Sequence, residues 1–187
     1  MKYFQFLKEK AKGYSLTELF RLEFESLFFG IFGLVPTTFG VILRGLICKV
    51  FFRSSKGFIW LQPNVILVHS DRITVGSNFA VNSGSYINGI GGIEIGSYVL
   101  IGSNVTISSG QHPIEGRFPP VFARKTIPKK IVIGDDVWIG AGAVIMPGIV
   151  IAKGTVIGAN SIVTKDTEEY AVMVGAPARK IRSRSDI

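Results

Sequence analysis

The sequence predicts an all-β solenoid of stacked coils that follows a helical N-terminal segment. Three observations favour this fold. From about residue 58 onward, Ile, Val or Leu opens successive units of six residues. The 22 glycines follow no collagen period, which indicates many tight turns. The composition is 47% apolar and 18% charged, which excludes a disordered chain and a charged coiled coil.

Residues 1–57 are expected to be a helical segment. Ser15 and Glu18 match a capping box, and apolar side chains at helical spacing follow them. The uncharged run at 28–43 includes Gly and Pro and is shorter than the about 20 apolar residues of a spanning helix. Two interpretations stay open: helices that pack on the main body or a neighbouring subunit, or an amphipathic hairpin in a membrane interface. The basic residues that would flank such a hairpin are Arg44, Lys49, Arg53 and Lys56.

The charge and the cysteine content limit the partners and the compartment. The net charge of +8 is concentrated in the first sixty residues, which favours an anionic partner such as a membrane surface. Nucleic acid has no other support and is not expected. The single cysteine, Cys48, lies among large apolar residues and is expected to be a packed thiol. With no convincing secretory signal, we expect a cytoplasmic protein, with peripheral association at the inner face of a membrane as a hypothesis.

Residues 58–187 carry the repeat. Written in sixes from Ile133, the chain reads "IGDDVW", "IGAGAV", "IMPGIV" and "IAKGTV". A helix needs apolar residues near every 3.6 positions and an amphipathic strand near every 2. A period of six fits a short strand plus a turn, with aliphatic side chains inside and small or polar residues at the corner. Three units would close a triangular coil, and we expect five or six coils around one aliphatic column.

The repeat is reset three times, by "RITVGS", "GIEIGS" and "KIVIGD". Because the three phrases are alike, they predict a structural device at a corner of the coil. The longest interruption follows His112 and forms an expected loop over residues 113–130. Long irregular loops inside compact repeats are uncommon and usually functional. This loop is basic, with Arg117, Arg124, Lys125, Lys129 and Lys130.

These repeats resemble the hexapeptide-repeat acyltransferases, and within them the maltose, galactoside and polysaccharide O-acetyltransferases. The resemblance covers about residues 58–187. It implies a left-handed parallel β-helix, a homotrimer with active sites between subunits, and acetyl-CoA as the acyl donor. A metal is not expected, because two histidines 43 residues apart without a Cys/His cluster do not make a ligand set.

The resemblance assigns roles to two residues before the loop. "GQHPI" is similar to the turn that carries the family's catalytic histidine, which implies that His112 is the general base. Imidazole titrates near neutral pH, so it suits the removal of a proton from a sugar hydroxyl. Thirty residues earlier stands Asn82, where the family has an asparagine that orients the acceptor. The other histidine, His69, matches no family role and is expected to be a structural corner residue.

The chain from Ile133 onward resembles the family's cofactor half. The resemblance implies that small residues line a groove for acetyl-CoA, and that cations meet its phosphates. Two alternatives stay open: Trp138 as an outer packing residue and "ARKIRSR" as a solvated basic C-terminal tail. The implied cofactor residues are Trp138, Gly140, Ala141, Ala159, Thr164, Lys165, Arg179 and Arg182.

The sequence thus predicts an acetyl-CoA-dependent O-acetyltransferase that acts on a sugar hydroxyl. The apolar N-terminus favours a cell-surface polysaccharide, or its precursor, as the acceptor. Two alternatives are an amino-sugar N-acetyltransferase on the same fold and a non-catalytic β-helix scaffold. Several relatives carry an N-terminal acidic residue near the acceptor, and no counterpart can be aligned here, so the identity of the sugar stays open.

Overall fold

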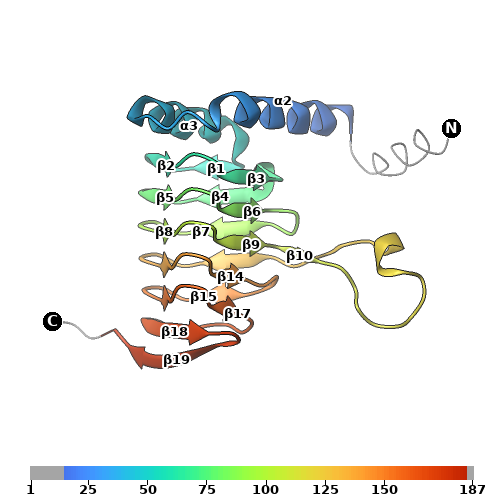
Figure 1. Ribbon diagram of the computed structural model, residues 1–187, viewed down its shortest axis with the longest axis vertical. Helices are drawn as coiled ribbons and strands as arrows, with labels where there is room; N and C mark the ends of the chain where they lie inside the picture. Colours follow the sequence, from blue (N-terminus) through green and yellow to red (C-terminus); the bar gives the residue numbers. More distant parts are fainter. Residues whose placement is uncertain (1–14, 185–187) are drawn as a thin grey trace.

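The computed structural model describes residues 15–184, which form a parallel β-helix with two helices across one end (Figure 1). The chain enters through α2 (Leu16–Phe32), turns back through α3 (Thr38–Phe51) and then winds away from the helices as a triangular solenoid. The predicted left-handed β-helix with helices at its N-terminal end is confirmed. Within residues 15–184, no helix is long and apolar enough to cross a membrane.

Three sheets form the sides of the solenoid, and successive coils add neighbouring strands to each sheet. Sheet A contains β1 (Ser54–Ser55), β4 (Ile73–Val75), β7 (Ile93–Ile95), β12 (Ile131–Ile133) and β15 (Val150–Ile151). Sheet B contains β2 (Ile59–Leu61), β5 (Phe79–Val81), β8 (Leu100–Ile101), β13 (Trp138–Ile139), β16 (Val156–Ile157), β18 (Ala171–Gly175) and β19 (Ala178–Ser183). Sheet C contains β3 (Ile66–Val68), β6 (Tyr86–Asn88), β9 (Thr106–Ser108), β14 (Val144–Ile145) and β17 (Ile162–Val163).

The aliphatic residues that define the repeat stack in one internal column. In sheet A, for example, Ile73, Ile93 and Ile131 are register partners in successive strands, and each is at most 1% exposed. Full burial of such a side chain contributes about 1.5–3 kcal/mol. The period of six persists in the sequence because each coil must fill the same inward position as the coil beside it.

We name the three edges of the solenoid AB, BC and CA after the sheets that they join in chain order. All three resets of the repeat follow insertions at the CA edge: residues 69–72, which include η1 (Ser70–Arg72), residues 89–92, and residues 109–130. These insertions support one another, since Arg72 Nη1 donates to the Ile90 carbonyl oxygen at 2.8 Å and Gly91 N donates to Ser109 Oγ at 2.8 Å. The predicted corner device is confirmed.

The helices cap the first coil through close backbone contact. The capping box of Ser15 and Glu18 is present, as the sequence predicts. Helix α3 lies against β2 at Gly45, where an added Cβ would lie only 2.0 Å from the Ile59 carbonyl oxygen. Cys48 is fully buried, and burial raises the pKa of its thiol, so the prediction of a packed cysteine is confirmed.

One expectation about a basic residue is wrong. Arg44 does not flank the apolar run as a surface cation: it is 1% exposed, and its guanidinium donates to the carbonyl oxygens of Phe32, Val35 and Leu61. Its side chain thereby satisfies carbonyl groups that the helical turn and β2 leave buried. The C-terminal basic segment is ordered, since residues 178–183 form β19, which pairs antiparallel with β18, and all of them except Ala178 are exposed to solvent.

Candidate active site

His112 lies on the CA edge, where the chain leaves the solenoid. It directly follows β10 (Gly110–Gln111), which pairs antiparallel with β11 (Ile127–Pro128). Residues 112–126 between these strands form the arm, which projects from the side of the solenoid (Figure 1) and includes η2 (Val121–Ala123). The two-stranded stem fixes the base of the arm, and the exposed side chain of His112 stands at that base.

The arm is held in shape by one arginine. The Nε atom of Arg124 donates to the carbonyl oxygen of Pro119 at 2.7 Å, and its Nη2 donates to that of Gly116 at 2.6 Å. Its Nη1 donates to the carbonyl oxygens of Pro113 at 3.0 Å and of Glu115 at 2.7 Å. These bonds connect the two limbs of the arm, so the segment that follows His112 has a defined path.

At equivalent positions of the BC edge, the backbone N–H of each coil donates to a carbonyl of the next coil. The first two coils have Gln62 and Asn82 at this position, and the three that follow have glycine: Gly102, Gly140 and Gly158. A Cβ on Gly140 would lie 2.6 Å from the nitrogen of Ala159 and 2.8 Å from the carbonyl oxygen of Ile157. Since both atoms belong to the backbone, they cannot give way. The residues after the glycines, Ala141 and Ala159, are exposed, so this edge presents a narrow backbone ledge.

Trp138 stands beside this ledge, on the outer face of sheet B. Its side chain is 52% exposed and lines a shallow hollow of about 400 Å³. Arg184 lines the same hollow and forms an ion pair with Asp136, at 2.9 Å between Nη1 and Oδ2. Arg179 and Arg182 lie on β19, the last strand of sheet B and three strands away from β13, and both are exposed.

The ten residues predicted for the site therefore fall into groups at different places. Asn82, Gly140, Ala141 and Ala159 lie on the BC edge, whereas His112, Thr164 and Lys165 lie on the CA edge. All of sheet C separates the two edges, and the roughly six residues of one side can extend over up to about 20 Å. A single chain thus places Asn82 on the same edge as Gly140, Ala141 and Ala159, and it places His112 on the edge of Thr164 and Lys165.

Comparison with known proteins identifies the family. The family described as "Bacterial transferase hexapeptide (six repeats)" matches residues 130–165. The galactoside O-acetyltransferase of Escherichia coli (strain K12) is 37% identical over 143 residues, which cover 76% of this chain and 70% of that protein. The chain belongs to the hexapeptide-repeat acyltransferases. The predicted family and the predicted class of enzyme, an acyltransferase, are confirmed.

Solved structures of the same family agree over most of the chain. A maltose O-acetyltransferase from Clostridium difficile 630 superposes with a TM-score of 0.81 at 31% identity, covering 94% of this chain and 91% of that one. A hexapeptide-repeat acetyltransferase from Vibrio cholerae O1 biovar eltor, in complex with acetyl coenzyme A, has a TM-score of 0.71 at 31% identity. That match covers 77% of this chain and 78% of the other.

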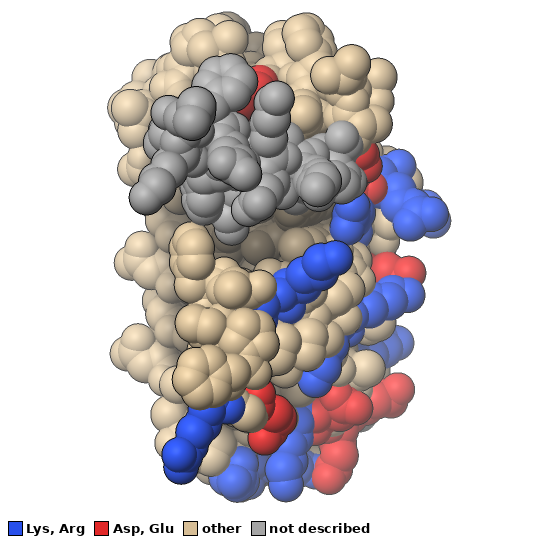
Figure 2. All heavy atoms as spheres, turned by 90° about the vertical axis from the view of Figure 1, so that its right-hand side faces the viewer, with Lys and Arg blue, Asp and Glu red and all other residues tan. Residues whose placement is uncertain are grey.

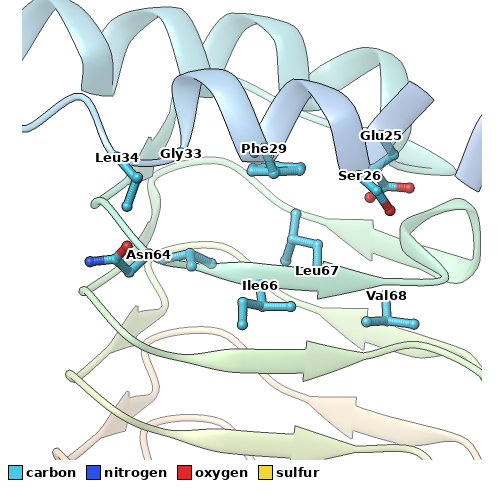
Figure 3. Close-up of a pocket in the computed structure, with 11 residues that line it drawn as sticks. Glu25, Ser26, Phe29, Gly33, Leu34, Asn64, Ile66, Leu67 and Val68 are labelled. Carbon is cyan, nitrogen blue, oxygen red and sulfur yellow. The ribbon is translucent and has the colours of Figure 1, made fainter. Parts of the chain in front are cut away.

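This acyltransferase also contains a cleft that its sequence does not reveal. The cleft, of about 360 Å³, lies between α2 and the first coil, and apolar side chains such as Phe29 and Leu67 line it (Figure 3). At one end stands Glu25, which is 3% exposed and whose carboxylate oxygens have no hydrogen-bond partner in the described structure. Burial raises the pKa of Glu25, and the nearby Ser70 hydroxyl opposes this shift more weakly.

The other histidine, His69, lies away from the candidate site and has a structural environment. His69 adopts the left-handed conformation, with φ of 53°, just before η1, and its side chain is buried. Burial lowers the pKa of His69, which favours the neutral imidazole of a structural residue. Among residues 15–184 no three His, Cys, Asp or Glu side chains are grouped so that they could hold a metal ion.

Proposed function

We propose that this chain is an acetyl-CoA-dependent O-acetyltransferase that acts on a sugar hydroxyl, with His112 as the general base. The observation that carries the proposal is the position of His112, exposed at the base of the ordered arm on the CA edge. The galactoside and maltose O-acetyltransferases that resemble this chain support a sugar acceptor. The relative in complex with acetyl coenzyme A supports the predicted donor.

The chemistry needs a base and a stabilised oxyanion. An imidazole nitrogen of His112 takes the proton of the sugar hydroxyl while the oxygen attacks the thioester carbonyl carbon. The resulting tetrahedral oxyanion accepts a hydrogen bond from a backbone N–H of the site. When the intermediate collapses, the C–S bond breaks, and the imidazolium returns its proton to the thiolate. The products are the sugar acetate and free CoA.

The donor would lie along the BC edge of a neighbouring copy, in a homotrimer. The ledge at Gly140, Ala141 and Ala159 leaves room for an extended chain, with Trp138 beside it. Arg179 and Arg182 are exposed cations with the chemistry to bind the phosphates of CoA. In this arrangement, Thr164 and Lys165 on the CA edge approach the donor from the other copy.

Two observations favour a shared site. His112 and Asn82 lie on different edges, so a base and an acceptor-orienting amide meet only when the CA edge of one copy faces the BC edge of another. The arm also exposes large apolar side chains, with Ile114 at 81% and Phe118 at 87%, which a second copy would cover. A cyclic head-to-tail contact of this kind closes with three copies.

The acceptor we propose is a cell-surface polysaccharide or its precursor. Asn82 is half-buried at the BC edge, where its amide has both a donor and an acceptor for sugar hydroxyls. A buried polar site rejects acceptors that leave its groups unpaired, so Asn82 would contribute to the choice of sugar.

The test is the release of CoA from acetyl-CoA across a panel of bacterial sugars and glycan precursors, with wild-type and His112→Ala protein. General-base catalysis contributes about 10²–10⁴-fold, so we expect a sugar-dependent signal that falls at least 100-fold in the variant while CoA binding is retained. The matched control is His69→Asn, which removes the other histidine and supplies a residue that tolerates the left-handed conformation.

The outcomes separate the parts of the proposal. Equal turnover by wild-type and His112→Ala protein would remove the base from the mechanism. A signal with amines but with no hydroxyl would replace the O-acetyltransferase by an amino-sugar N-acetyltransferase. Failure of both proteins to bind CoA would refute the donor.

A further inference from the structure

Helices α2 and α3 turn an apolar surface away from the solenoid. On α2, exposed apolar side chains recur at spacings of four and three residues, and on α3 they recur at three and four, so each set forms one stripe along its helix. Their exposed fractions range from 41% to 86%. We call these residues the docking face: Leu16, Phe20, Phe24, Leu27, Ile31, Phe39, Ile42, Leu46 and Val50.

The docking face points along the axis of the solenoid. The opposite sides of the same helices are buried against the first coil, through Glu25 and Phe28 of α2 and through Arg44 and Cys48 of α3. The two helices lie side by side across the end of the solenoid (Figure 1), packed together through contacts such as Phe28 with Phe51. In the view of Figure 2, Lys and Arg side chains spread over the solenoid, while the visible part of the helical layer is nearly free of them.

Soluble monomers rarely expose large contiguous apolar patches, and the docking face combines nine large apolar side chains, so it requires an occupant. Helices with one apolar side and basic flanks lie in the interface of a bilayer, with the apolar side at the boundary between headgroups and acyl chains. Exposed cations lie near the face: Lys49 in the last turn of α3, and Arg53 and Lys56 on either side of β1 in the first coil, which the helices cap. The acidic Glu23 is exposed on α2.

We propose that the docking face inserts into the surface of an anionic lipid bilayer. Charge selects this occupant over a second copy of the chain: an end-to-end contact of two copies would bring together two faces whose surroundings both carry a net positive charge, from Lys49, Arg53 and Lys56 against Glu23, which is unfavourable. Anionic lipids instead attract such cations, by about 1 kcal/mol for each Lys or Arg near the surface.

Docking fixes the height of the candidate catalytic base above the lipid, a consequence that rests on the proposed function. β3, β6 and β9 are consecutive in sheet C, and two steps of about 4.8 Å separate β3 from β9, which leads to His112. A helical layer about 10 Å thick lies above the first coil. His112 then stands about 20 Å from the docking face, within reach of a glycan that a lipid holds at the membrane. Three copies around an axis parallel to the solenoid would dock together.

The test is the co-sedimentation of the full chain, without donor or acceptor, with vesicles of phosphatidylcholine alone or mixed with phosphatidylglycerol. We expect binding to the anionic vesicles, and at least a tenfold lower partition coefficient for Phe20→Ser with Leu27→Ser. Lys49→Gln should lower binding about fivefold at low salt. The control, Val150→Ser, removes an apolar side chain that is 41% exposed in sheet A, outside the docking face, and should bind as the wild type does.

Orientation has its own measurement, since the chain contains two tryptophans, Trp60 and Trp138. With both replaced by Phe, a tryptophan placed by Leu27→Trp should be quenched by brominated lipid. In a variant with Trp60→Phe, Trp138 is the remaining tryptophan and should not be quenched, because three strand steps of about 4.8 Å separate it from the first coil.

Three results would overturn the proposal: binding that ignores the docking-face substitutions, quenching of Trp138 equal to that at position 27, or lipid-free pairs that the same substitutions dissociate. The last result would assign the face to a second copy. Because vesicle binding is measured without acetyl-CoA, its failure leaves the proposed reaction intact, and the loss of CoA release leaves the docking result intact.

Discussion

Replacement of Arg124 tests whether the arm must be ordered for catalysis. Its guanidinium makes four hydrogen bonds to carbonyl oxygens across the arm, at 2.6 to 3.0 Å. A typical bond of this kind contributes about 0.5–1.5 kcal/mol net, and partial exposure favours the low end, so the set contributes about 2 kcal/mol. Arg124→Ala should therefore shift the ratio of ordered to disordered arm about 30-fold and lower kcat/KM by up to the same factor.

The assay combines CoA release, limited proteolysis and thermal unfolding. We expect trypsin to cleave the Arg124→Ala arm faster, while Tm stays unchanged because the arm contributes no residue to the buried core. Arg124→Lys should behave similarly, since an ammonium group lacks the planar fork that reaches several carbonyls. The matched control is Lys125→Ala, which removes an exposed neighbouring cation and should leave activity intact. Unchanged proteolysis and kinetics in Arg124→Ala would refute the role of this arginine.

Two further predictions concern buried positions. Glu25→Gln should raise the stability of the protein at pH 7. The pKa of Glu25 is higher in the folded than in the unfolded state, so the folded state binds the carboxyl proton more tightly. The wild type therefore loses stability as pH rises from the ordinary pKa of a glutamate, near 4.5, through the raised pKa of Glu25. Urea unfolding at pH 4 and pH 7 checks this, and an equal effect at both values would contradict it. Gly140→Ala should lower stability by about 1–3 kcal/mol, since its Cβ would overlap the backbone of the next coil. Gly30→Ala, where an added Cβ meets nothing within 4 Å, is its control in a thermal melt, and equal Tm values would show that the ledge can yield.

The fold was predictable because one physical requirement repeats in every coil. Ile73, Ile93 and Ile131 fill the same inward position, so the sequence displays the architecture several times over. The helical cap was predictable for a local reason, the hydrogen bonds between Ser15 and Glu18. The prediction of the handedness and the proposal of a trimer came from the resemblance to a family, since periodicity carries no information about either.

The site was less predictable, because its contacts join residues that no period relates. Nothing in the sequence distinguishes Arg124, which turns inward to the backbone, from Lys125 beside it, which is exposed. The prediction that Arg44 lies at the surface was wrong because a cation beside an apolar run usually faces water. Here the backbone carbonyl oxygens around Arg44 accept its hydrogen bonds and compensate for its burial. The cleft at Glu25 depends on how α2 lies over β3, which the sequence does not encode locally.

The position of the three insertions explains how this acyltransferase carries an arm without losing its core. Within a strand, one added residue would turn every following side chain to the other face, whereas at an edge the strands on both sides keep their inward pattern. All three insertions lie at the CA edge, and each supports the next. Arg72 donates a hydrogen bond to the carbonyl oxygen of Ile90. The backbone N–H groups of Gly91 and Lys129 donate to Oγ and to the carbonyl oxygen of Ser109, at 2.8 and 2.7 Å. The BC edge can then stay uniform and narrow. In the proposed function, the interrupted edge would bear the base and the uninterrupted edge would hold the donor, and the two edges would meet when copies of the chain assemble side by side.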